Sequence, residues 1–98
     1  MATRFEWDDA KAKSNLRKHG VAFEDAIFTF TDPFALMQQD RFEGGERRWQ
    51  TLGMVGGYLV ILVAHTVGED EDGTEVIRLI SARAADRKER KHYENQAR

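Results

Sequence analysis

The apolar and polar positions near the amino terminus predict a short strand followed by a helix. Residues 5–7 alternate apolar, polar and apolar side chains, as a strand with one buried face does. Asp8 or Asp9 can cap a helix that runs to about His19, because a carboxylate at this position accepts hydrogen bonds from free backbone N–H groups. Gly20 then supplies the left-handed backbone conformation at which many helices end.

A second, shorter helix is predicted by the spacing of three large apolar residues. Phe23, Ile27 and Phe30 repeat at intervals of four and three, so they share one helix face. Asp32-Pro33 should end this helix, because proline lacks the backbone N–H that a helix interior needs. Residues 34–40 can form a strand after this break.

Three further strands are expected, separated by turns. They cover residues 46–54, 58–67 and 75–81, and paired glycines at 44–45 and 56–57 mark tight turns between them. The stretch 58–67 is nearly all β-branched or aliphatic, which predicts a central strand covered on both faces. An acidic loop should connect it to the strand that follows.

The last helix should begin at a capping box. Asp86 and Glu89 have the spacing at which each side chain bonds the other's backbone N–H, and the helix should run to about Ala97. The predicted order is a short N-terminal strand, two helices, an antiparallel meander sheet and a C-terminal helix. This is the α+β class, with one domain over residues 1–98 and the helices on one side of the sheet.

Charge is distributed unevenly along the chain. The net charge of −2 argues against a protein that is basic over its whole surface. Residues 1–20 nevertheless hold five basic and three acidic side chains, and residues 83–98 hold six and three, whereas residues 69–75 hold five acidic side chains and no basic one. The two basic ends can hold phosphates. A solvated helix face explains the C-terminal run of charge equally well.

Composition also excludes several classes of protein. The chain has no cysteine, which excludes disulfide scaffolds, thiolate zinc sites and cysteine nucleophiles. The longest apolar stretch, residues 58–64, is too short to cross a bilayer, and no apolar run follows Arg4 as a targeting signal would require. We therefore expect a cytoplasmic protein that does not contact membranes.

His65 is the most informative of the three histidines. It interrupts an apolar run near the end of the predicted central strand, where its ring can reach the sheet surface and transfer a proton. The alternative is a ring that is satisfied by a backbone carbonyl and has no function. His19 and His92 are far away in the sequence and no companion carboxylate stands at ligand spacing, so we expect no metal site and no cofactor.

Several arginines interrupt the predicted strands in the same way. Arg78 should face away from Ile77 and Leu79, and Arg83 follows just beyond that strand. Glu46, Arg48 and Gln50 share one face of their strand, whereas Arg47 and Trp49 share the other. Taken singly, each arginine is explained by a surface ion pair.

Together these residues suggest cleavage of RNA without a metal. That reaction needs a base for the 2′-hydroxyl proton, an acid for the leaving oxygen and cations beside the phosphorane. The candidate catalytic residues are His65, Arg83, Arg48, Arg78 and Glu46. Lys18, Trp49 and Tyr93 are candidates for binding RNA, the two aromatic residues by stacking on bases, although Tyr93 is better suited to helix packing.

The sequence as a whole resembles the BrnT-type toxins of type II toxin–antitoxin systems. The resemblance runs in order along nearly the whole chain. It rests on residues 5–8, Lys11, Asn15, residues 18–21, Phe23-Glu24, Ala26, Asp32-Pro33, Glu46, Arg48, Trp49, Gly53, Val63, His65, Thr66, residues 80–83, Glu89-Arg90 and Tyr93.

The resemblance implies a RelE-like fold and metal-independent cleavage of RNA that slows translation. It also implies a BrnA-like ribbon-helix-helix antitoxin as partner, with operator DNA contacted only through the complex. Two features depart from the family's usual pattern: the chain is not basic, and the segment 68–75 is unusually acidic. This segment would repel RNA if it flanks the site, and it is equally suited to contact a basic partner.

Two alternatives remain open. The chain can be a catalytically weak or inactive module that acts mainly by binding the antitoxin, which the acidic loop and the near-neutral charge favour. A metal-dependent nuclease is the other, which the spacing of the residues does not favour.

Overall fold

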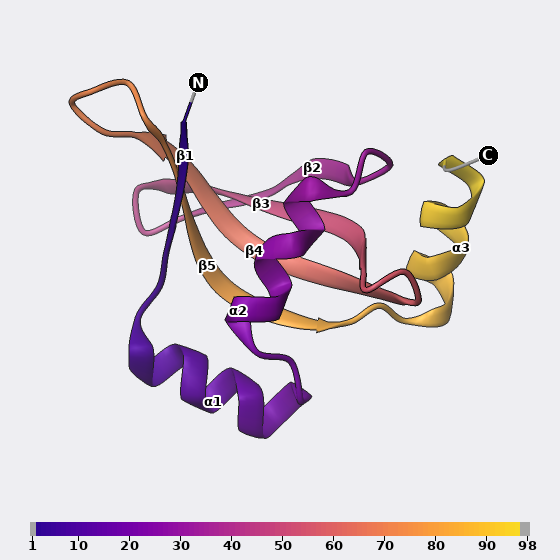
Figure 1. Cartoon of the computed structure of the whole chain (residues 1–98). Helices are drawn as coiled ribbons and strands as arrows, with labels where there is room; N and C mark the ends of the chain where they lie inside the picture. The colour runs from indigo at the N-terminus through magenta and orange to yellow at the C-terminus, as the bar shows by residue number, and fades with distance from the viewer. Residues whose placement is uncertain (1, 97–98) are drawn as a thin grey trace.

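The computed structural model, which describes residues 2–96, contains one five-stranded sheet (Figure 1). The strands lie in the order β1-β5-β4-β3-β2, so β4 is central, as predicted. Neighbouring strands are antiparallel, except that β1 runs parallel to β5. The strands are β1 (Thr3–Glu6), β2 (Leu36–Glu43), β3 (Glu46–Val55), β4 (Leu59–Glu69) and β5 (Glu75–Ala84).

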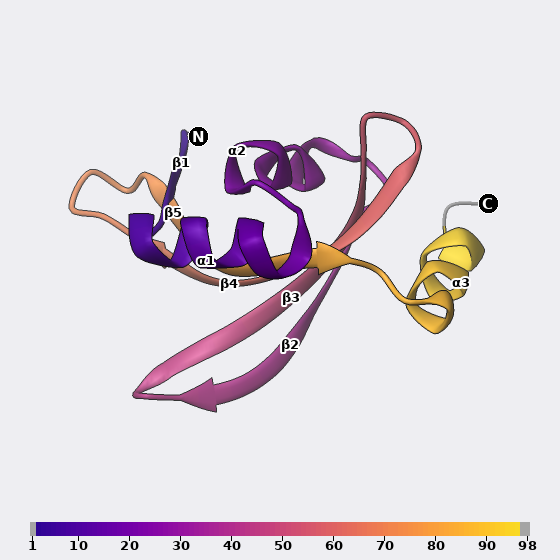
Figure 2. The same ribbon diagram turned by 90° about the horizontal axis from the view of Figure 1, so that it is seen from below.

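The helices are α1 (Asp9–His19), α2 (Phe23–Ala26) with a 3₁₀ turn η1 (Ile27–Thr31), and α3 (Arg87–Gln96). Figure 2 shows α1 and α2 on the same side of the sheet, with α3 beyond the end of β5. In residues 2–96, no helix is both long and apolar enough to span a membrane. The α+β architecture predicted from the sequence is confirmed.

The helix ends follow the predicted local chemistry. Asp8 caps α1 by accepting hydrogen bonds from the backbone N–H groups of Ala10 and Lys11, and Gly20 ends the helix with a φ of 71°. At α3, the backbone N–H of Glu89 donates to Asp86 and that of Asp86 donates to Glu89, so the predicted capping box is confirmed.

Two apolar clusters lie on opposite faces of the sheet. The first packs Ile61 and Val63 of β4 against Phe23 and Ala26 of α2. The second packs Leu62 against Tyr93 of α3, and Leu62 points away from Ile61 and Val63 because strand residues alternate. The prediction that all helices lie on one side of the sheet is therefore wrong for α3, which covers one end of the other face.

The bounds of two strands differ from the prediction, each for its own reason. The strand expected at residues 34–40 begins at Leu36, because the Asp32 carboxylate accepts a hydrogen bond from the N–H of Phe34 and holds that residue in a turn. The last strand extends to Ala84, three residues beyond the prediction, because its continuation pairs with the start of β4.

Candidate functional site

The sheet face turned away from α1 and α2 carries most of the predicted catalytic residues. Arg78 lies opposite Thr66, and Arg83 lies opposite Leu62, two positions of β4 that share this face. The buried Ile77 points to the covered side, as predicted. We call this surface the open face and define it by Glu6, Glu46, Arg48, Gln50, Thr66, Arg78, Ser81 and Arg83.

A β-bulge at Ile80 brings Arg78 and Arg83 onto the same face. Residues five apart on a regular strand point to opposite faces. The pairing of β4 with β5 moves from His65 opposite Leu79 to Ala64 opposite Ser81, so Ile80 is an extra residue in β5. Without the bulge, the alternation of side chains along β5 would place Arg83 on the covered face. The extra residue Ile80 shifts the alternation by one position, so Arg83 lies on the open face.

Each open-face arginine has a carboxylate partner, the arrangement that the ion-pair alternative predicted. Arg78 of β5 pairs with Glu46 of β3, and their side chains are 41% and 43% exposed. Arg48 Nε lies 3.8 Å from Glu43 Oε2, and this nitrogen is buried without a hydrogen-bond partner among the described residues. A phosphate can displace Glu46 from Arg78, because ion pairs with both side chains exposed typically contribute only about 0–1 kcal/mol.

The third pair, Arg83 with Glu89, has two parallel hydrogen bonds of 2.8 and 2.9 Å. The hydrogen bonds that Arg83 donates to Glu89 raise the pKa of Arg83, and the same contact lowers the pKa of Glu89 despite partial burial. Because Glu89 also caps α3 with Asp86, the guanidinium is fixed to the start of that helix.

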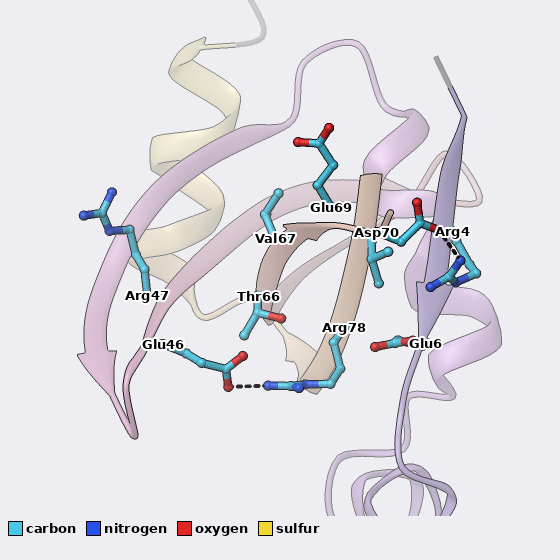
Figure 3. A pocket seen from close by; sticks show the side chains of 11 residues that line it. Arg4, Glu6, Glu46, Arg47, Thr66, Val67, Glu69, Asp70 and Arg78 are labelled. Atoms are coloured by element: carbon cyan, nitrogen blue, oxygen red, sulfur yellow. Dashed lines mark hydrogen bonds and ion pairs between the residues drawn. The ribbon is translucent and has the colours of Figure 1, made fainter. Parts of the chain in front are cut away.

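The Arg78–Glu46 pair lies in a hollow of about 420 Å³ at one end of the open face (Figure 3). Glu6 points toward the guanidinium of Arg78 in this view. Four carboxylates and three guanidinium groups line the hollow. Two of these carboxylates are Glu69 and Asp70, so the acidic segment does flank this end of the open face. Asp70 bonds Arg4 at 2.8 Å, which leaves little free positive charge there.

A second hollow, of about 300 Å³, lies between the open face and α3. Gln38 and Gln50 of the sheet line it together with Lys88, Glu89 and His92 of the helix. This grouping was not predicted from the sequence, although residues 88 and 92 are four apart and so share a helix face. The hollow places a titratable ring beside the Arg83–Glu89 pair.

His65 does not reach the sheet surface, so that expectation is wrong. Its side chain is 0% exposed and lies on the covered face, with the Phe30 ring 4.9 Å away, centroid to centroid. Nδ1 lies 3.3 Å from the Thr66 carbonyl, which can only accept, so Nδ1 carries the proton and Nε2 accepts from the Thr51 hydroxyl at 2.7 Å. A ring buried in this way cannot contact a substrate. Its two nitrogens have hydrogen-bond partners within the protein, as predicted by the alternative in which His65 has no function.

Burial of His65 predicts a loss of stability in mild acid. Desolvation lowers the pKa of the ring below 6.5, against the raising effects of the Thr66 carbonyl and the charge of Glu75. The unfolded chain therefore takes up this proton first, so the free energy of unfolding should fall as the pH drops below 6.5. Chemical denaturation at several pH values should show a steeper fall for the wild type than for His65→Gln. The exposed His92→Gln control should behave as wild type, and identical slopes in all three proteins would contradict the prediction.

Tyr93 also cannot stack on a base, because it is only 3% exposed on the side of α3 that packs against the sheet. Its hydroxyl donates to Asp32, whose carboxylate also accepts the N–H of Met54 at 2.8 Å. Burial, followed by this hydrogen bond and the charge of Asp32, raises the pKa of Tyr93 to about 12. Burial raises the pKa of Asp32, but its hydrogen bonds outweigh that effect and the pKa is lowered. Tyr93 therefore attaches α3 to the sheet, which is the packing role considered for it.

The remaining RNA-binding candidates, Trp49 and Lys18, are not residues of the open face. Trp49 is paired with His65 and so points to the covered side of β3, where it is half-buried. Lys18 is exposed in the last turn of α1. The structure therefore places Glu46, Arg48, Arg78 and Arg83 on one face of the sheet. His65 and Trp49 lie on the other face, and Tyr93 is buried between α3 and the sheet.

Comparison with known proteins identifies the family of the chain. The sequence profile of the family described as "Ribonuclease toxin, BrnT, of type II toxin-antitoxin system" matches residues 7–89. The chain belongs to the BrnT family. The 1.1 Å crystal structure of the ribonuclease toxin BrnT from Brucella abortus matches with a TM-score of 0.62 and 24% sequence identity, over 88% of this chain and 100% of that one. A search of curated proteins found no match.

Membership of the BrnT family makes the chain a ribonuclease toxin of a type II system, a class in which the toxin has an antitoxin as partner. The match covers all four open-face residues that the structure brings together, as well as Glu89. Within residues 2–96, no three histidine, aspartate or glutamate side chains gather as metal ligands.

Proposed function

We propose that this BrnT-family chain cleaves RNA at the open face without a metal ion, with Glu46 as the base. Glu46 removes the proton from a 2′-hydroxyl, whose oxygen then bonds the adjacent phosphorus. The bond from phosphorus to the 5′-oxygen breaks, and this oxygen takes a proton from water, which reaches the exposed face. The products are a 2′,3′-cyclic phosphate and a 5′-hydroxyl.

The observation that carries this proposal is the contact between Glu46 and Arg78. A base must lie beside the phosphate it serves, and a guanidinium fork is suited to bind two phosphate oxygens. Both side chains are about two-fifths exposed, so a phosphate can enter between them. Negative charge that develops on the phosphorane would be stabilised by Arg78.

Arg48 and Arg83 would bind the RNA backbone on the open face beside the Arg78–Glu46 pair. The side chain of Arg48 is 22% exposed, so its positive charge would attract an RNA phosphate on this face. Arg83 is held rigidly by Glu89 and the start of α3, so it can position a neighbouring phosphate at small entropic cost. Neither role needs His65, which lies on the other side of the sheet.

In the cell, this activity would act on RNA in the cytoplasm and slow translation. A BrnA-like ribbon-helix-helix antitoxin would neutralise it by covering the toxin. Contact with operator DNA would then come from the antitoxin in the complex. The shared family supports these points, because type II toxins are paired with protein antitoxins.

The proposal predicts that purified protein cuts single-stranded RNA in the presence of EDTA. Replacing Arg78 by alanine should lower the rate at least 100-fold, the size expected when a donor to the transition-state charge is lost (about 10²–10³). Arg17→Ala, which removes the same charge from an exposed position of α1, should retain the rate. Loss of cleavage in EDTA with recovery in Mg²⁺ would contradict the proposal, as would an Arg78→Ala variant with the wild-type rate.

A second candidate function is favoured by the ion pairs themselves. All three open-face arginines are engaged by carboxylates, and the acidic segment flanks Arg78. A chain with these features could act mainly by binding its antitoxin. Expression without the antitoxin distinguishes the two functions: growth arrest with RNA fragments supports the ribonuclease, and normal growth with tight antitoxin binding supports the binding module.

A further inference from the structure

A basic hollow outside the open face lies between α1 and the edge of β5. It has a volume of about 210 Å³ and is lined in part by Lys11, Ser14, Lys18 and His19 of the helix and by Ser81 of the strand. None of the described residues that line it is acidic. In this it differs from the hollow at Arg78, whose wall includes four carboxylates.

The two lysines carry free charge. Within residues 2–96, neither Lys11 nor Lys18 forms an ion pair, whereas Arg48, Arg78 and Arg83 all do. Both lysines are exposed, so their side chains are free to reach a ligand. Two lysine charges on α1 that no carboxylate neutralises are therefore available to attract an anion beside the open face.

The position of this hollow is fixed by Asn15. Its side chain is 5% exposed and bonds the backbone N–H and C=O of Ala82 at 3.0 and 2.8 Å, which holds α1 against β5 beyond the end of β1. Lys11 and Lys18 lie four residues before and three after Asn15, so they flank it on the same helix face. They are thereby placed beside Ser81.

Ser81 connects the hollow to the open face. It is paired with Ala64 across the sheet and lies between Arg78 and Arg83 along β5. An RNA strand whose scissile phosphate sits at Arg78 is repelled at one side by Glu69 and Asp70. The hollow at Ser81, where the lysines lie, has no acidic residue in its described lining. Its volume of about 210 Å³ admits a phosphate group, to which the hydroxyls of Ser14 and Ser81 can donate.

We propose that Lys11, Lys18, Ser14 and Ser81 form a second site that binds the phosphodiester backbone of single-stranded RNA next to the cleavage site. The inference rests on the proposed ribonuclease function and deepens it. The site gives affinity for RNA without reading its sequence, because lysines and hydroxyls contact phosphates and not base edges. The site supplies local positive charge for binding RNA in a protein whose net charge is −2.

The test is the affinity for a 20-nucleotide RNA with 2′-O-methyl riboses, which lack the attacking hydroxyl and so stay intact. Fluorescence anisotropy between 50 and 200 mM salt should compare wild type with Lys11→Gln/Lys18→Gln. Each lost phosphate contact lowers the salt exponent by about 0.7, which corresponds to about fivefold in affinity at 0.1 M salt. We expect the double variant to bind about 25-fold more weakly, with an exponent smaller by about 1.4.

The matched control is Lys13→Gln/Arg17→Gln. It removes the same charge from the same helix, but positions 13 and 17 lie on the face turned away from Asn15. This control should bind within about twofold to threefold of wild type, because charges beyond a Debye length of about 10 Å are screened. Glutamine has nearly the helix propensity of lysine, so both variants should fold.

Cleavage separates this inference from the proposed function. With the long RNA, the Lys11→Gln/Lys18→Gln variant should show a raised KM. With a dinucleotide, whose single phosphate cannot occupy both sites, its loss of kcat/KM should be much smaller. Equal weakening by both double variants would overturn the inference, because net charge alone would explain it. The inference would also be overturned if the Lys11→Gln/Lys18→Gln variant bound RNA as tightly as the wild type. This holds even if the variant lost affinity for an acidic peptide, because the lysines would then bind a protein and not RNA. If the wild type binds RNA through these lysines but cleaves nothing, the site stands and the ribonuclease proposal fails.

Discussion

Replacing Glu46 by glutamine is expected to lower the rate of RNA cleavage by about 10²–10⁴-fold, the usual contribution of a general base. Glutamine keeps the size of the side chain and its ability to bond Arg78, but it cannot take a proton at neutral pH. Because the lost interaction arises only in the transition state, kcat should fall while KM changes little. The measurement is the initial rate on a fluorogenic single-stranded RNA at saturating substrate.

The appropriate control removes a carboxylate that lies elsewhere on the sheet. Glu24 is exposed on α2, on the covered side, and Glu24→Gln should keep the wild-type kcat. A thermal unfolding curve for each variant shows whether the fold is retained. A Glu46→Gln variant with full activity would remove this residue from the mechanism, and Arg78 would then serve only to bind RNA.

Replacing Asn15 by alanine is expected to have the largest effect on stability. The amide of Asn15 donates to the carbonyls of Val21 and Ala82 at 3.0 and 2.8 Å, and its oxygen accepts the N–H of Ala82 at 3.0 Å. Alanine would leave three backbone groups without partners at a buried position. Each such group costs roughly 1–3 kcal/mol, so the free energy of unfolding should fall by about 3 kcal/mol or more.

That loss is a large part of the 5–15 kcal/mol by which folded domains are usually stable. The same substitution at Asn95, which is exposed on α3, serves as the control and should change the free energy by less than about 0.5 kcal/mol. Both values come from chemical denaturation followed by circular dichroism. Equal, small changes in the two variants would show that water replaces Asn15 without cost, contrary to the buried geometry.

Local signals in the sequence were sufficient for most of the secondary structure. Asp8 and Gly20 define the ends of α1 because caps depend on neighbouring backbone groups only. The paired glycines at 44–45 adopt positive φ in the predicted turn, as the turn requires. The parallel pairing of β1 with β5 had no such signal, because it joins residues more than 70 positions apart.

The candidate site was harder to predict, because a strand pattern gives the alternation of side chains but not interruptions in it. Arg78 was placed correctly by its buried neighbours Ile77 and Leu79. Arg83 shares its face only because Ile80 bulges. His65 was expected at the surface from its place in an apolar run, yet the same run is what buries it beneath Phe30.

The sequence by itself determined the family, the order of elements and the set of chemical groups available for RNA cleavage, because each of these depends on residue identity and on spacing over a few positions. Only the tertiary structure decided which groups act together. The pairing of distant strands placed Glu46 beside Arg78, and the packing of helices enclosed His65 and Tyr93. Such contacts join residues far apart in the chain, and their geometry is decided by burial and register, which no short stretch of sequence contains.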